Sequence, residues 1–121
     1  MWISQAAAHG TFSFPNGFYQ IMYDFNAVRP QIEALCKKAG VTKLMAFGSA
    51  VREDFTSSSD IDLVYSAPDT MGLQDKGRFL QELERVFNRK VDLLTENGLR
   101  GMTNPFRKKT ILEDLTTIYA S

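Results

Sequence analysis

Apolar residues recur every three or four positions in three stretches of the chain, which is the spacing of one face of an α-helix. The first stretch, residues 25–40, carries Pro30 near its start and ends at Gly40, a residue type that commonly terminates helices. The second covers residues 71–87, and the third covers residues 104–120. The pattern predicts three amphipathic helices that bury Phe25, Val28, Ile32, Leu35, Cys36 and Ala39; Leu73, Leu80, Leu83, Val86 and Phe87; and Ile111, Leu115 and Ile118.

Shorter apolar runs between these helices have the length of β-strands. They cover residues 43–47, 60–66 and 90–95, and their composition is typical of buried strands. Near the start of the chain, the aromatic-rich runs TFSF and FYQIMY are separated by Pro15-Asn16-Gly17, a common turn sequence. We therefore expect a β-hairpin within residues 1–24.

The order of these elements indicates an α+β (α/β-like) fold, in which helices flank a mixed β-sheet. A chain of 121 residues with 44% hydrophobic residues fits one domain with a substantial core. We accordingly divide the chain into an N-terminal hairpin extension, residues 1–24, and one compact domain, residues 25–121.

Charge and cysteine content narrow the possible partners and location. Lysine plus arginine and aspartate plus glutamate both number 14, a balance that argues against nucleic acid as the primary ligand. No apolar run is long enough to span a membrane, so we expect no membrane partner. The single cysteine, Cys36, excludes an internal disulfide, and a cytoplasmic location is expected.

Three aspartates stand in or beside the predicted strands. Asp60 and Asp62 share one face of the strand at 60–66, because side chains alternate along a strand, and their Cα atoms would lie about 6–7 Å apart. Asp92 adds a third carboxylate if the strand at 90–95 pairs beside them with the same face outward. Such oxygen ligands favour Mg²⁺ or Mn²⁺ over zinc. The alternative is that they are strand-end residues in water, or helix N-caps.

A Gly-Ser pair follows the predicted strand at 43–47. Gly48 would let the backbone approach a ligand closely, and a helix that starts near Ser49 would direct free N–H groups at an anion. Arg52 could offer a further donor to a polyphosphate beside a metal site. On its own, a Gly-Ser pair is more typical of an ordinary turn than of a phosphate site.

Taken together, these motifs resemble the polymerase-beta-type nucleotidyltransferase superfamily, and most closely its minimal nucleotidyltransferase (MNT) branch. The resemblance rests on Gly48-Ser49, ten intervening residues and Asp60-Ile61-Asp62, then Val91-Asp92-Leu93, and a final segment with Arg107, Ile111-Leu112-Glu113 and Tyr119. It spans residues from about 25 to 120, so residues 25–121 would form the MNT domain with the fold of that superfamily.

The resemblance implies roles for these residues and a reaction. Gly48 and Ser49 would hold the β- and γ-phosphates of ATP, while Asp60, Asp62 and Asp92 would be catalytic and would hold two Mg²⁺ ions, with Mn²⁺ as a substitute. The implied reaction is Mg²⁺-dependent transfer of AMP from ATP to a hydroxyl.

The resemblance also implies an acceptor, most directly a tyrosine of a cognate HEPN-type toxin, so that the chain would act as an antitoxin in a toxin–antitoxin system by AMPylation. One alternative is transfer to a small molecule such as an aminoglycoside. Another is a catalytically weak binding module that neutralises its partner by contact, which is favoured by Glu53 in place of a small neutral residue. Whether the chain forms a homo-oligomer is also left open by the sequence.

Overall fold

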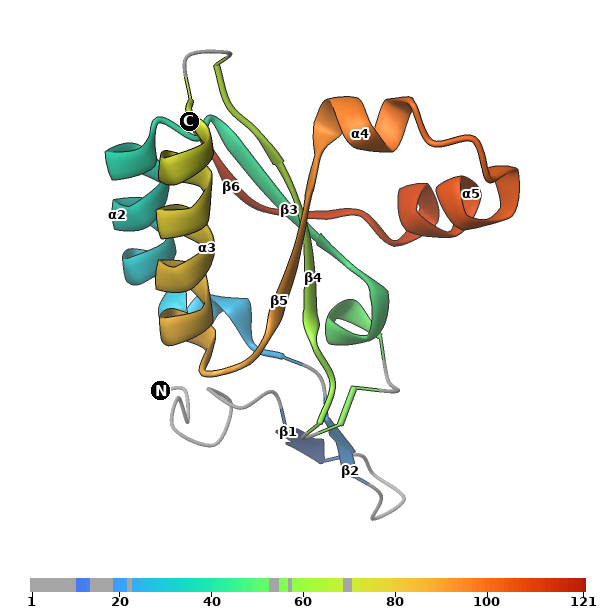
Figure 1. The fold of residues 1–121 in the computed structure, drawn as a ribbon. Helices are drawn as coiled ribbons and strands as arrows, with labels where there is room; N and C mark the ends of the chain where they lie inside the picture. Colours follow the sequence, from blue (N-terminus) through green and yellow to red (C-terminus); the bar gives the residue numbers. More distant parts are fainter. Residues whose placement is uncertain (1–10, 14–18, 22, 53–54, 57, 69–70) are drawn as a thin grey trace.

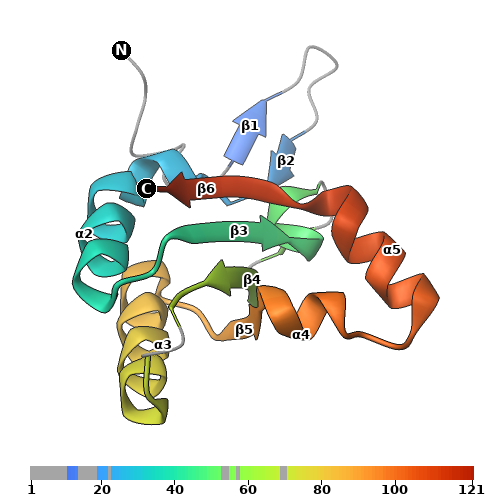
Figure 2. The ribbon, with the colours of Figure 1, turned by 90° about the horizontal axis from the view of Figure 1, so that it is seen from above.

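The computed structural model describes residues 11–13, 19–21, 23–52, 55–56, 58–68 and 71–121 (Figure 1). Within this part of the chain, four strands form one mixed sheet in the order β5-β4-β3-β6 (Figure 2). These strands are β3 (Lys43–Phe47), β4 (Ile61–Ser66), β5 (Val91–Thr95) and β6 (Thr116–Ala120). Strand β3 is antiparallel to β4 and β6, whereas β4 is parallel to β5. The predicted α+β fold with a mixed sheet is confirmed.

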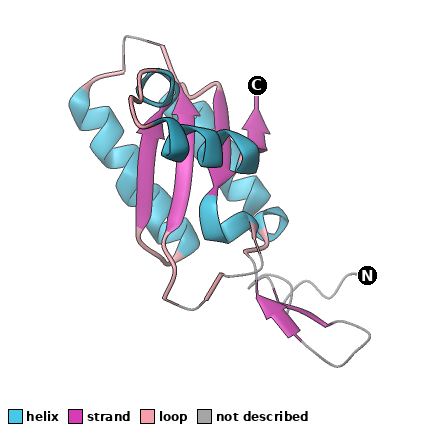
Figure 3. Ribbon diagram, turned by 90° about the vertical axis from the view of Figure 1, so that its right-hand side faces the viewer, coloured by secondary structure: helices cyan, strands magenta, loops and turns pink. Residues whose placement is uncertain are grey.

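Helices lie on both faces of this sheet (Figures 1 and 3). Helices α2 (Arg29–Ala39) and α3 (Leu73–Phe87) cover one face, and α4 (Glu96–Arg100) and α5 (Pro105–Asp114) lie on the other. Two 3₁₀ turns, η1 (Phe25–Val28) and η2 (Gly48–Val51), precede α2 and follow β3. Across the described ranges, none of the helices combines the length and the apolar character needed to cross a bilayer.

The two long helices on the first face confirm the predictions from helical periodicity. Helix α2 has Pro30 in its first turn and ends at Gly40, whose φ of +77° places it in the left-handed region. Helix α3 ends at Asn88, which adopts the same region. The first turn of the predicted 25–40 helix is a separate 3₁₀ turn, and the Asp24 side chain caps it by accepting a hydrogen bond from the Asn26 N–H.

Alternate residues of β3 and β4 contribute to two separate hydrophobic cores. The larger core, against α2 and α3, takes Leu44, Ala46, Ile61, Leu63 and Tyr65 from these strands. The smaller core, against α4 and α5, takes Met45, Phe47 and Val64. Because side chains alternate along a strand, Asp62 points to the same side of the sheet as α4 and α5.

The prediction of one helix over residues 104–120 was wrong in its second half. Helix α5 ends at Asp114, and Thr116–Ala120 forms strand β6, which pairs antiparallel with β3. The β-branched and aromatic residues of this segment favour a strand. Its pairing supplies hydrogen-bond partners along the second edge of β3, and it buries Ile118 and Tyr119 against the larger core.

The expected N-terminal hairpin corresponds to a separate two-stranded sheet (Figure 3). Strands β1 (Thr11–Ser13) and β2 (Tyr19–Ile21) pair antiparallel, with Phe12 opposite Gln20. The Pro15-Asn16-Gly17 turn lies outside the described residues. The division of the chain at residue 24 stays a prediction.

Candidate active site

The predicted site residues converge on one edge of the four-stranded sheet. Strand β3 ends at this edge, and its neighbour β4 begins there because the two strands are antiparallel; β5 begins there too because it is parallel to β4. In the ladder, Asp62 lies opposite Phe47 on one side and opposite Asp92 on the other. Residues in register on adjacent strands face the same side of a sheet. Asp62 and Asp92 are therefore neighbours on the side that carries α5.

The three predicted carboxylates differ in their surroundings. Asp60 immediately precedes β4 and is exposed, Asp62 is half-buried, and Asp92 is exposed. Burial raises the pKa of the Asp62 carboxyl above its usual range, and the negative charges of Asp92 and Asp60 raise it further. The cations Arg107 and Arg52 act in the opposite direction. The pKa of Asp62 therefore depends on the neighbouring acids and arginines of the site as well as on burial.

The chemistry of these side chains fits a divalent cation, although their present arrangement does not enclose one. Over the described ranges, no group of three aspartate, glutamate, histidine or cysteine side chains converges in a way that could hold a metal ion. The donors are hard carboxylate oxygens, and the repulsion acting on Asp62 is what a cation would relieve. Asp60 and Asp92 are exposed, so their carboxylates are accessible to a cation from solvent.

Gly48 is required at this edge for two reasons. Its φ of +76° is a backbone conformation that residues with a side chain rarely adopt. A Cβ atom at this position would also lie 2.5 Å from Oδ2 of Asp62, which is too close for any real contact. Gly48 opens the 3₁₀ turn η2, in which Ser49 is half-buried and Ala50 is buried. The Gly-Ser pair therefore brings a backbone turn directly against the Asp62 carboxylate.

Arg52 follows this turn and connects it to α5. Its Nη1 donates to Oδ2 of Asp114 at 2.8 Å, and Asp114 is the last residue of that helix. The residue predicted to offer a donor to phosphate thus lies at the site, in an ion pair with an acidic residue of the facing helix. The prediction did not include this partner, because the contact joins residues 62 positions apart.

A cavity of about 340 Å³ lies between this sheet edge and α5. The sheet side contributes Phe47, Gly48, Arg52 and Asp62, and the helix contributes Phe106, Arg107, Thr110, Ile111 and Asp114. Ser49, Asp60 and Asp92 adjoin these residues in the chain or in the ladder. The volume falls at the lower end of the range for small-molecule sites.

Sequence reasoning named Arg107 and Ile111 of the final segment but missed the other residues of the helical wall, Phe106, Thr110 and Asp114. Phe106, Thr110 and Asp114 recur at a spacing of four, which places them on one face of a helix, and that spacing was the available signal. Helical periodicity alone, however, does not show which face of a helix meets a functional site.

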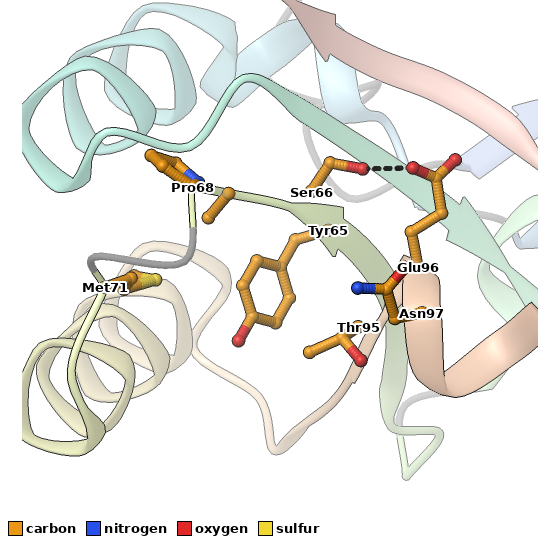
Figure 4. Close-up of a pocket in the computed structure, with 8 residues that line it drawn as sticks. Tyr65, Ser66, Pro68, Met71, Thr95, Glu96 and Asn97 are labelled. Atoms are coloured by element: carbon orange, nitrogen blue, oxygen red, sulfur yellow. Dashed lines mark hydrogen bonds between the residues drawn. The ribbon is translucent and has the colours of Figure 1, made fainter. Parts of the chain in front are cut away.

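A second cavity of about 340 Å³ lies at the opposite end of β4 and β5 (Figure 4). Its described lining residues are Tyr65, Ser66, Ala67, Pro68, Met71, Thr95, Glu96 and Asn97. There the Ser66 hydroxyl donates to Oε1 of Glu96 at 2.6 Å, and Arg100 lies 3.4 Å from the same carboxylate oxygen. The two cavities have the same volume, but the predicted site residues Gly48, Arg52 and Asp62 line the cavity under α5. We therefore place the candidate site at the cavity under α5.

Comparisons with known proteins identify the family and the fold of the chain. Residues 28–118 match the family model described as "Nucleotidyltransferase domain". The chain is 30% identical over 95 residues to the Methanocaldococcus jannaschii protein named "Putative protein adenylyltransferase MJ0435", covering 78% of this chain and 98% of that protein.

Solved structures show the same fold. A structure described as that of a "putative minimal nucleotidyltransferase" is 26% identical, with a TM-score of 0.60 over 75% of this chain and 89% of the other. A chain from the complex of a tri-AMPylated Shewanella oneidensis HEPN toxin with an MNT antitoxin is 18% identical, with a TM-score of 0.54 over 80% of this chain and 73% of the other. The present chain belongs to the nucleotidyltransferase domain family.

Proposed function

We propose that this nucleotidyltransferase transfers AMP from ATP to a protein hydroxyl, a tyrosine of a cognate HEPN-type toxin, and so acts as an antitoxin. The observation that carries the reaction is the register of Asp62 with Asp92 beside the Gly48 turn, where Asp62 and Gly48 line a ligand-sized cavity. The choice of a protein as acceptor is supported by the name of the M. jannaschii relative. The match to this chain covers nearly the whole length of that relative. It is also supported by the fold shared with a chain from a complex that contains an AMPylated HEPN toxin.

In this proposal the carboxylates hold the metal and the Gly-Ser turn holds the phosphates. Asp60, Asp62 and Asp92 are the ligands of two Mg²⁺ ions, and Gly48, Ser49 and Arg52 contact the β- and γ-phosphates. When bound, the ions would lower the pKa of the acceptor hydroxyl and neutralise the leaving pyrophosphate. The ion pair with Asp114 holds the Arg52 guanidinium at the cavity wall, where a phosphate oxygen could reach it.

The transfer itself is a displacement at the α-phosphorus of ATP. The acceptor oxygen forms a bond to that phosphorus as the bond to the bridging oxygen of pyrophosphate breaks. The hydroxyl proton passes to a carboxylate, for which Asp92 is suited because it is exposed and next to Asp62. Holding both reactants in line at the edge of the sheet accounts for much of the expected acceleration.

A second candidate function is a binding module of the same fold that neutralises its partner by contact alone. It is favoured by the absence, over the described ranges, of three converging metal ligands. Glu53, the other feature that favours it, lies outside the described residues. Nucleotide binding that depends on Mg²⁺ would separate the two functions, because only the enzyme requires it.

The test uses the chain co-purified from its native cells together with its bound partner. The complex is incubated with Mg²⁺ and ATP, and the intact mass of every chain is measured. We expect the partner to gain one or more AMP units, to gain none with Asp62→Asn, and to gain them normally with Glu113→Gln. Glu113 is an exposed carboxylate of α5, so its substitution removes the same charge outside the cavity. A stable complex without any gain in mass would favour the binding module.

A further inference from the structure

Phe106 is an exposed aromatic residue on the wall of the candidate site. Its side chain is 83% exposed, although water is an unfavourable environment for an aromatic ring. Over the described residues, the other exposed large hydrophobic side chains are Leu73 and Leu112, and neither lines this cavity. Phe106 therefore combines exposure with a place at the site, which suggests that a ligand covers the ring.

The backbone that carries Phe106 is fixed by local hydrogen bonds. The Asn104 side chain accepts hydrogen bonds from the Phe106 N–H and from the Arg107 N–H, both at 3.1 Å. Thr110 Oγ1 donates to the Phe106 carbonyl at 2.9 Å. Pro105 stands at the start of the helix, where its fixed φ suits the first turn. The ring is thus presented from an ordered helical turn.

Apolar and charged side chains both line the cavity that Phe106 borders. Arg107 is the next residue in the helix, and its positive charge reaches Asp62 strongly enough to oppose the rise in the pKa of that carboxyl. Arg52 and the Gly48 turn lie across the cavity on the sheet side. Asp62 and Asp114 also line the cavity. A ligand that fits it therefore carries a flat apolar group for the ring, and negative charge for the arginines and for a cation held by Asp62.

We propose that Phe106 stacks on the base of the bound nucleoside triphosphate, while Arg107 contacts its phosphates. This inference rests on the proposed function, since it assumes that ATP binds in the cavity under α5. Aromatic stacking adds binding energy for any base, because every base has a π-face. Phe106 would therefore make the site prefer a nucleoside triphosphate over an inorganic polyphosphate, without selecting strongly among bases.

The test compares the binding of ATP with the binding of inorganic tripolyphosphate, both with Mg²⁺, by calorimetric titration of the full chain. We expect Phe106→Ala to raise the dissociation constant for ATP about tenfold, and to change that for tripolyphosphate by less than about twofold. Leu112→Ala is the matched control, because Leu112 is a half-exposed residue of the same helix outside the cavity, and it should alter neither constant. Arg107→Gln should weaken both ligands.

A spectroscopic readout adds a direct test of stacking. In a Trp2→Phe background, Phe106→Trp supplies the sole tryptophan of the chain. We expect ATP, but not tripolyphosphate, to quench its fluorescence, with the affinity for ATP restored to that of the unaltered chain.

Three results would overturn the inference. Unchanged ATP affinity in Phe106→Ala would overturn the stacking role of Phe106 and leave the proposed function standing. The same result would be obtained if the ring contacts the acceptor and not the base. Equal weakening of ATP and tripolyphosphate would indicate a structural role for the ring. Failure of the unaltered chain to bind ATP would overturn both this inference and the proposed function.

Discussion

The two faces of the sheet are packed differently. On the face of α2 and α3, the larger core brings together side chains that exclude water almost completely, among them Leu44, Leu63 and Leu83. On the face of α4 and α5, the smaller core covers only part of the sheet, and a cavity remains where β3 ends. The first face provides most of the buried apolar area that stabilises the fold, and the second leaves polar groups accessible.

The difference between the two faces shows where a small domain can tolerate a charged side chain. Asp62 alternates with Ile61 and Leu63, which are fully buried, yet its own carboxylate faces the open side of the sheet. The same carboxylate on the closed side would be buried without a partner, at a cost of several kcal/mol. We therefore expect substitutions on the two faces to separate stability from activity.

The largest effect on activity should come from a substitution on the face covered by α4 and α5. We expect Asp62→Asn to lower AMP transfer at least about 100-fold, since it removes a proposed metal ligand. Its free energy of unfolding should not fall, because the carboxylate it replaces is disfavoured by burial and by its acidic neighbours. Transfer is followed by intact mass, and stability by urea denaturation. Comparable transfer by the variant would exclude Asp62 from the catalytic machinery.

Substitutions on the face covered by α2 and α3 should lower stability without changing nucleotide binding. Leu83 is fully buried in the larger core, and Leu83→Ala should reduce the free energy of unfolding by about 2–5 kcal/mol. At a temperature where the variant stays folded, its affinity for ATP should be unchanged. Leu73→Ala in the same helix is the control, because Leu73 is exposed and its loss should change stability by less than about 0.5 kcal/mol. A weakened ATP affinity in folded Leu83→Ala would show that the faces are coupled.

Gly48 contributes both to the stability of the fold and to the geometry of the site, so its substitution should affect stability and activity together. Gly48→Ala places a side chain in the left-handed region, which costs about 1–2 kcal/mol, and its Cβ would displace the Asp62 carboxylate. We expect lower stability together with reduced transfer. Gly77→Ala is the matched control, because a Cβ there meets no atom within 4 Å and should stabilise α3 by up to about 1 kcal/mol. Full activity in Gly48→Ala would contradict the close approach to Asp62.

The smallest expected effect is on the pH dependence of stability, because Asp62 is partly exposed and solvent screens its charge. Its pKa in the folded chain is raised above the ordinary value of 3.8, so the folded state binds this proton more tightly than the unfolded state. This contribution to stability is present below 3.8 and is lost as the pH rises through the folded pKa. Metal-free wild type should therefore lose stability relative to Asp62→Asn over that interval, and a constant difference would contradict the shift.

Much of the fold and part of the site could be predicted from the sequence, because both depend on local patterns. Periodicity placed α2, α3 and three of the strands, and alternation along β4 placed Asp62 on a face shared with Asp92 once the strands were assumed to be neighbours. Strand β6 was mistaken for helix because Ile111, Leu115 and Ile118 also fit helical spacing. Its pairing with β3 decides the outcome, and that contact is not local in the sequence.

Most of the helical wall of the cavity escaped prediction for the same reason. Asp114 meets Arg52, and Phe106 meets the cavity, only because α5 packs across the sheet edge through Ile111. The short helix α4 was also missed, since five residues are too few to show a period. Motif spacing predicts groups carried by adjacent strands, whereas the opposite wall of a cavity depends on how a helix docks.

In the proposed function, the sheet edge under α5 is a metal-dependent nucleotide site. The most direct measurement is calorimetric titration of the full chain with ATP, in Mg²⁺ and in EDTA, for the wild type, Asp92→Asn and Glu113→Gln. We expect binding in Mg²⁺ that disappears in EDTA, is lost or strongly weakened in Asp92→Asn, and is unchanged in Glu113→Gln. ATP binding that is equally strong in EDTA, or in Asp92→Asn, would contradict this expectation.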